Sequence, residues 1–88
     1  MTQAEILSNQ TNCAVVQLPT RRFPGVVVQG DSLSGLVADL RTASEALGIG
    51  DLDEAQGWLA EVIDWLEDAK TTYETTLADR GIELPYPS

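Results

Sequence analysis

Hydrophobic residues follow two different patterns along the chain. Up to Gly30 they occur in short runs of β-prone residues, and after Gly30 they recur at every third or fourth position. The first pattern is typical of strands and the second of amphipathic helices. We therefore expect an α+β protein in which a sheet, formed by residues 1–30, precedes two helices.

The sheet region contains three β-prone runs, AEILSN, NCAVVQL and PGVVVQG. Gln10 and Thr11 separate the first two, and Pro19 and Pro24 with Gly25 lie between the second and third, where proline and glycine favour turns. We expect a three-stranded antiparallel meander. Three consecutive valines in the third run predict a strand that is central or buried on both faces.

The first helix is predicted over residues 31–48. Asp31 or Ser32 is expected to cap its start, and Gly48 with Gly50 to end it. Its predicted apolar face consists of Leu33, Leu36, Val37, Leu40, Ala43 and Leu47.

The second helix is predicted over residues 51–80, with Asp51 and Glu54 forming a capping box and Gly81 ending it. Its predicted apolar face consists of Leu52, Ala55, Leu59, Val62, Ile63, Leu66, Ala69, Tyr73 and Leu77. Residues 81–88 contain two prolines and are expected to form an extended tail. The predicted order is β-β-β-α-α, in a single domain of residues 1–88.

The length of the second helix favours association with other protein. A helix over residues 51–80 is about 45 Å long, whereas a compact chain of this size is only about 30 Å across. Trp58 and Trp65 lie seven residues apart, beside the predicted apolar face. They either complete the core of one subunit or form a homodimer or partner interface, where aromatic residues are enriched. Because 88 residues bury only a thin core, we expect a homodimer.

Acidic residues dominate the second half of the chain. The chain has 14 acidic and 5 basic residues, a net charge of −9, and ten of the acids follow residue 50. This balance argues against nucleic acid or an anionic membrane as partner, because both require basic residues. No apolar run is long enough to span a membrane, and the N-terminus lacks the basic region of a signal peptide, so we expect a cytoplasmic protein.

The acidic face of the second helix has two interpretations. It is either a solvated face that keeps the protein soluble, or a docking surface that attracts a basic protein. For the second interpretation the predicted contact residues are Glu61, Asp64, Glu67 and Asp68, with Trp58 and Trp65 as anchors. Arg21 and Arg22, beside Phe23, form a second candidate edge.

The sequence offers little for catalysis. It contains no histidine, and its only cysteine, Cys13, lies in an apolar run that favours a buried, inert thiol. The segment DLDE lacks the glycine turn and the spacing of an EF-hand, and we expect neither a metal nor a cofactor.

Residues 30–33 spell GDSL, a tetrapeptide that resembles the motif of GDSL esterases and lipases, in which the serine is the nucleophile. That family activates its serine with a histidine, and this chain has none. We therefore expect no enzyme activity. The hydrolase alternative survives only if Ser32 reacts with a fluorophosphonate.

The segment FPGVVVQGDSL, residues 23–33, followed by an amphipathic helix, resembles the core of HicB-type antitoxins. The resemblance covers residues 12–47. The chain also looks like a small uncharacterised bacterial family that shares this segment and, before it, the residues Leu18, Pro19, Arg21 and Arg22. That similarity extends over the whole chain but implies no function.

The HicB resemblance implies a dimeric, non-catalytic protein that covers a small, basic, RNA-cleaving toxin. HicB proteins commonly carry a C-terminal DNA-binding element, whereas this chain ends in an acidic helix and LPYPS, so we do not expect operator binding. We expect a non-enzymatic acidic module of the antitoxin or immunity type that binds a basic protein. The alternative is a homodimeric structural or scaffold domain.

Overall fold

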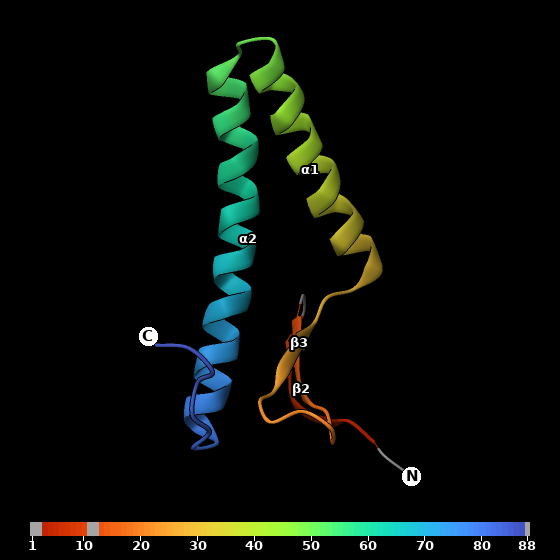
Figure 1. Cartoon of the computed structure of the whole chain (residues 1–88), viewed down its shortest axis with the longest axis vertical. Helices are drawn as coiled ribbons and strands as arrows, with labels where there is room; N and C mark the ends of the chain where they lie inside the picture. Colours follow the sequence, from red (N-terminus) through yellow and green to blue (C-terminus); the bar gives the residue numbers. More distant parts are fainter. Residues whose placement is uncertain (1–2, 11–12, 88) are drawn as a thin grey trace. The chain divides into compact units, whose positions relative to one another are not determined.

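The computed structural model describes residues 3–10 and 13–87. Its elements, in chain order, are β1 (Glu5–Gln10), β2 (Cys13–Gln17), β3 (Gly25–Val27), α1 (Gly30–Gly48) and α2 (Leu52–Asp79) (Figure 1). The predicted β-β-β-α-α order is confirmed. Thr11 and Asn12, expected between the first two strands and at the start of the second, lie outside the described residues.

The three strands form an antiparallel sheet in the order β1-β2-β3. The register between β1 and β2 shifts between Ile6 and Ser8, which leaves Leu7 as an extra residue in β1. Such a β-bulge bends an edge strand and removes one residue from the ladder. β1 is therefore an edge strand with an interruption at its middle.

The prediction of a central or buried third strand was wrong. β3 is a short edge strand, and Val26 and Val27 are 44% and 49% exposed. β2 takes the central place instead, and Val15 within it is fully buried. Consecutive valines favour extended backbone, but the pairing of the strands decides which one is covered.

Glycines end both helices as predicted. Gly50 has a φ of +80°, and the Asp51 N–H donates to the Ala46 carbonyl at 2.9 Å. Gly81 has a φ of +67°, and the Ile82 N–H donates to the Leu77 carbonyl, also at 2.9 Å. Each glycine adopts the left-handed conformation that closes the last helical turn and reverses the chain.

The two helix starts differ in how well the sequence predicted them. Asp51 caps α2 as expected, because its Oδ1 accepts the Glu54 N–H at 3.2 Å. For α1 the prediction was wrong: the N-cap is Gln29, which makes no side-chain capping bond. The Asp31 carboxylate instead accepts the N–H of Ser32 at 2.8 Å, inside the first turn.

The described chain divides into two compact units. The sheet unit contains Met1–Val28 and Ala69–Ser88, and the helical hairpin contains Gln29–Asp68. Helix α2 contributes its first part to the hairpin and its last part to the sheet unit. The expectation that all 88 residues form one domain stays a prediction.

The core of the sheet unit joins the central strand to the end of α2. Val15 and Leu77 are fully buried, and Tyr73 is 7% exposed. The Tyr73 hydroxyl donates a 2.7 Å hydrogen bond to the carbonyl of the buried Pro24. Leu7 and the tail residues Ile82, Leu84 and Tyr86 pack around this cluster. The tail therefore packs on this core, a contact that was not predicted from the sequence.

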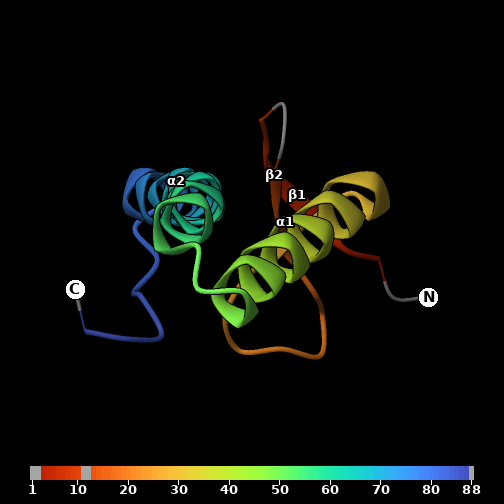
Figure 2. The same cartoon turned by 90° about the horizontal axis from the view of Figure 1, so that it is seen from above.

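The helical hairpin consists of α1 and the first part of α2, which are antiparallel and are joined by the turn at residues 49–51 (Figures 1 and 2). Its buried residues are mostly small: Ala43 and Ala46 in α1, and Ala55 and Val62 in α2. The larger residues that we expected on the buried faces are exposed. They are Leu33, Val37, Leu40 and Leu47 in α1, and Leu52, Leu59, Ile63 and Leu66 in α2.

Among the residues that the structure describes, neither helix is both long enough and apolar enough to span a membrane.

Candidate functional site

The formal charge of the chain lies in one of its two units. The helical hairpin contains ten acidic residues and one arginine, a charge of −9, whereas the sheet unit contains equal numbers of acidic and basic residues. The division is sharper than the sequence halves indicated, because Asp31, Asp39 and Glu45 of α1 belong to the hairpin together with only one arginine. The hairpin is therefore the part of the chain that attracts cations.

The four acidic residues predicted to dock a partner are all exposed on α2. Glu61 and Asp68 are seven residues apart and thus lie along one line of the helix, with Asp64 beside them. Glu67 lies further round the helix, next to the exposed Ile63. The helix therefore groups three of the four carboxylates on one side and separates Glu67 from them.

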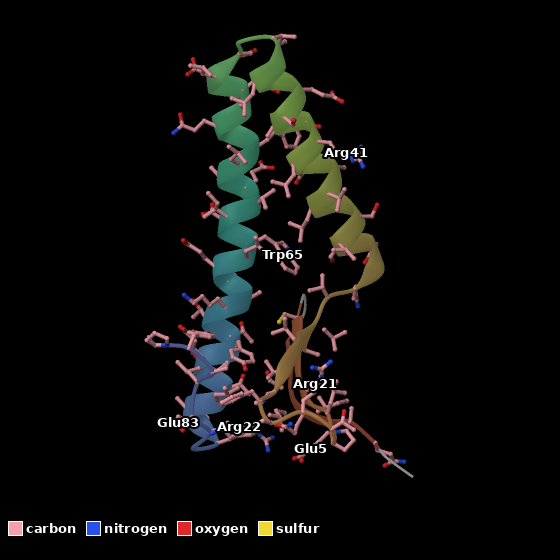
Figure 3. The ribbon with its side chains drawn as sticks, viewed as in Figure 1. Glu5, Arg21, Arg22, Arg41, Trp65 and Glu83 are labelled. Carbon is pink, nitrogen blue, oxygen red and sulfur yellow. The ribbon has the colours of Figure 1, made fainter. Side chains whose placement is uncertain are left out.

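Trp58 and Trp65 are both half-buried on α2. The Trp58 indole Nε1–H donates to Glu54 Oε1 at 2.9 Å, which holds the ring against the preceding turn. Figure 3 shows Trp65 on the side of α2 that faces α1, and Arg41 on the side of α1 that points away from α2. Both tryptophans thus lie beside the carboxylates and partly inside the hairpin.

A hollow of about 260 Å³ lies over Gly57, where the missing side chain leaves space on the helix surface. Its lining residues are Asp53, Glu54, Gly57, Trp58 and Glu61. An indole ring with neighbouring carboxylates is suited to a lysine or arginine side chain, which gains cation–π and charge interactions there. The hollow was not predicted, although Gly57 next to Trp58 was a signal for it.

Arg21 and Arg22 belong to the sheet unit and not to the acidic hairpin. Both are exposed in the turn before β3, where the Arg21 N–H donates to the Leu18 carbonyl at 3.2 Å. Gln17 Nε2 donates to the Arg21 carbonyl at 2.8 Å, and the Arg22 guanidinium lies 5.0 Å from the centre of the Phe23 ring. These contacts order the turn and leave both cations accessible to solvent.

Ser32 of the GDSL segment lies half-buried in the first turn of α1. The carboxylate beside it, Asp31, accepts the Ser32 backbone N–H and is exposed. Within residues 3–10 and 13–87, no three metal-ligating side chains come close enough together to hold an ion.

Arg80 holds the bulge of β1. Its Nη2 donates to the Leu7 carbonyl at 3.1 Å, and its Nη1 lies 3.6 Å from Glu5 Oε2. Leu7 is the extra residue of the bulge, so its carbonyl takes the guanidinium as partner. The sequence did not indicate this contact, because the two residues are 73 positions apart.

Replacing Arg80 with methionine is expected to lower the free energy of unfolding by about 1 kcal/mol, mostly through the lost bond to the Leu7 carbonyl. Glu5→Gln is expected to cost less, about 0.5 kcal/mol or below, because both members of the ion pair are exposed. Urea denaturation measures both values, with Arg41→Met in the hairpin as control. Equal losses for Arg80→Met and Glu5→Gln would show that the ion pair, and not the carbonyl bond, stabilises the bulge.

A second cavity, of about 520 Å³, opens in the sheet unit between β1 and the end of α2. It is lined by Leu7, Ser8, Thr71, Thr72, Thr75, Thr76, Asp79 and Arg80. The Thr76 hydroxyl already donates to the Thr72 carbonyl at 2.7 Å. Sequence reasoning missed this groove, although the repeated threonines of TTYETT, one helical turn apart, were its signal.

Three groups of the sheet unit have pKa values above their usual range. Cys13 is buried as we expected, and burial raises the pKa of its thiol. Burial also raises the pKa of Tyr73. The Tyr86 pKa is raised first by burial and then by the neighbouring Glu74, while its hydroxyl has no partner in hydrogen-bonding geometry among the described residues.

The two tyrosines predict a loss of stability at high pH. Their pKa values exceed the usual 10.0 in the folded protein, so the unfolded chain releases these protons first as the pH rises. The free energy of unfolding is therefore expected to fall above about pH 10 through the tyrosines, after an earlier decline near pH 9 through Cys13, whose pKa is raised from 9.0. Urea midpoints measured between about pH 8 and 11 test this. Tyr86→Phe is expected to reduce the decline, and an unchanged decline in this variant would contradict the role of Tyr86.

The comparisons with known proteins yield a family and no function. A search of curated proteins finds no match to this chain, and a search of solved structures finds none either. A family model described as "Family of unknown function (DUF6959)" matches residues 1–86, nearly the whole chain. This match agrees with the expected similarity to an uncharacterised family. The chain therefore belongs to the family of unknown function DUF6959.

Proposed function

We propose that this protein is a non-enzymatic binding module of the antitoxin or immunity type, which covers a basic protein partner. The observation that carries the proposal is the charge of the helical hairpin, −9 in 40 residues, whereas the sheet unit is neutral. A charge concentrated in this way steers a basic protein to one surface and speeds its association.

The docking surface is the side of α2 that holds Trp58 and Trp65 together with Glu54, Glu61, Asp64 and Asp68. The tryptophans supply rigid apolar area at the centre of the contact, as such residues do in protein interfaces. The hollow over Gly57 accepts one lysine or arginine side chain of the partner, and the carboxylates around it bind further basic groups. Glu67, further round the helix, contributes to steering at the edge of this surface.

The resemblance of residues 23–33 to HicB-type antitoxins supports the same class of function. In this proposal the partner is a small basic toxin, and the chain inhibits it by covering its surface. A homodimeric scaffold is the second candidate, and the aliphatic side chains exposed on the hairpin favour it.

Co-expression tests the proposal. This chain is produced together with each small basic protein encoded beside its gene, and complexes are isolated by size exclusion. We expect one such protein to form a stable complex and to arrest growth when it is expressed alone. The complex is expected to weaken steeply when ionic strength rises from about 50 to 500 mM, since the Debye length shortens. A partner that is acidic, or a complex unaffected by salt, would contradict the proposal.

Trp58→Ala is the matched test of the docking surface, with Phe23→Ala in the sheet unit as control. We expect the Trp58 variant to weaken the complex by about tenfold to a hundredfold, as is usual for a central aromatic contact residue, and the control to change it little. The opposite result would move the docking surface to the edge formed by Arg21 and Arg22.

A further inference from the structure

The helical hairpin exposes a set of large aliphatic residues that the docking surface for a basic partner does not use. Each is between 36% and 66% exposed, and we call the set the aliphatic face. It consists of Leu33, Val37, Leu40 and Leu47 of α1, and Leu52, Leu59, Ile63 and Leu66 of α2.

The helical periodicity places both halves of this set on the same side of the hairpin. In α1 the exposed aliphatic residues are displaced around the helix axis from the buried Ala43 and Ala46. In α2 they are displaced from the buried Ala55 and Val62, and the direction of rotation about the helix axis is the same in both helices. Because the two helices run antiparallel (Figure 1), rotation in the same sense brings both stripes to one face. The tryptophans of α2 are rotated in the opposite sense and thus lie toward the other face.

Most charges of the hairpin follow the same division, and two lie at the border of the aliphatic face: Glu67, next to Ile63, and Arg41, one turn after Val37. Glu61, Asp64 and Asp68 lie on the part of α2 away from its aliphatic stripe, by the same periodicity. In α1, Asp31 and Glu45 are likewise separated from the stripe, and Asp39 is half-buried beside Ala43. The interior of the aliphatic face is thus uncharged, so two copies can meet there without bringing rows of carboxylates together.

The dimensions of the aliphatic face suit a second copy of itself. The stripes run from Leu33 to Leu47 and from Leu52 to Leu66, so each spans 15 residues and a rise of about 21 Å. Two antiparallel stripes of equal length form a surface that a two-fold rotation can place on its own image. Taking roughly 150 Å² for a fully exposed aliphatic residue, half-exposure gives about 600 Å² per copy and about 1,200 Å² for two, the lower limit for stable interfaces.

We propose that the aliphatic face of the hairpin packs against the same face of a second copy of this chain and forms a four-helix bundle. The tryptophan and carboxylate surface then lies on the outside of the dimer, where it remains open to a basic partner. This inference concerns a different face of the hairpin from the docking surface of the proposed function, and it does not depend on that function. It specifies which surface makes the dimer that the thin core predicted.

Sedimentation equilibrium over about 1 to 100 µM tests the dimer. The variant pair Leu40→Ala with Ile63→Ala removes one aliphatic side chain from each helix, and alanine preserves helix propensity. We expect a dimer for the unchanged chain and a dimer dissociation constant about a hundredfold higher for this pair. Leu18→Ala with Val26→Ala, at positions of similar exposure in the sheet unit, is the control, and we expect a change below about threefold.

The salt dependence separates this proposal from the proposed function. A dimer formed across an uncharged face is expected to persist or tighten between about 50 and 500 mM salt, because salt screens the repulsion between two acidic copies. Reversing Asp64 and Asp68 to lysine is expected to leave the dimer intact while it weakens binding of a basic partner. A monomer over the whole concentration range, a dimer that the alanine pair leaves unchanged, or a dimer that salt dissociates would overturn the proposal.

Discussion

Replacing Leu77 with alanine is expected to lower the free energy of unfolding of the sheet unit by about 3 kcal/mol. Leu77 is fully buried in a cluster with Val15 of β2, and Ile82 and Leu84 of the tail pack against this cluster. Truncating Leu77 leaves a cavity that the surrounding residues cannot fill, because the sheet holds Val15 and the hydrogen bond to Pro24 holds Tyr73. The large effect follows from how few buried residues the unit has.

Urea denaturation followed by circular dichroism measures this loss. Leu18→Ala is the matched control, since it removes the same side chain from a position that is 43% exposed in the same unit, and we expect a loss below about 1 kcal/mol. Leu77→Val, a smaller change, is expected to cost about 1 kcal/mol and covers the case in which the alanine variant does not fold. Equal losses at Leu77 and Leu18 would show that the tail does not close over the core as described.

The sequence predicted the helices better than the sheet, for a physical reason. A helix is specified by contacts within four residues and by its ends, so Gly50, Asp51 and Gly81 placed the ends of both helices to within one or two residues. The place of a strand depends on partners far along the chain. The three valines therefore indicated extended backbone at β3 without indicating that β3 lies at an edge.

The candidate site shows the same limit. The spacing of Trp58 and Trp65 and the run of acids were visible in the sequence, and the structure places them on α2 as expected. Periodicity also showed that Leu59, Ile63 and Leu66 share a face, but it could not show that nothing within their own unit buries them. Amphipathicity specifies which residues lie together, whereas the covering element comes from tertiary or quaternary packing.

The long-range contacts of Arg80 are a further feature that one sequence does not predict. A bulge is specified by one extra residue in β1, and its stabilisation by a cation 73 positions later leaves no local pattern. Sequence reasoning finds such a pair only when many related sequences are compared, because contacting positions then change together. One sequence alone indicates only that Arg80 lies at the C-terminus of α2, where its positive charge interacts favourably with the helix dipole.

Reversing two carboxylates of the docking surface is expected to abolish most of its affinity for cations. In the variant Asp64→Lys with Asp68→Lys, each side chain changes from attracting to repelling a basic group, which costs about 1 to 1.5 kcal/mol per residue and weakens binding by about 30-fold to 150-fold in total. A peptide of alternating arginine and alanine is a suitable probe, because it lacks tryptophan and leaves the fluorescence of Trp58 and Trp65 as the signal.

The matched control is Asp79→Lys with Glu83→Lys, which changes the net charge equally but alters exposed residues of the sheet unit. If the charge of the hairpin attracts the peptide, the control retains its affinity within about threefold at low salt, and the difference between the two variants decreases as salt is added. Equal weakening in both variants would mean that the peptide responds to net charge alone. The hairpin would then be a solvated acidic face, and the basic partner would have to bind elsewhere.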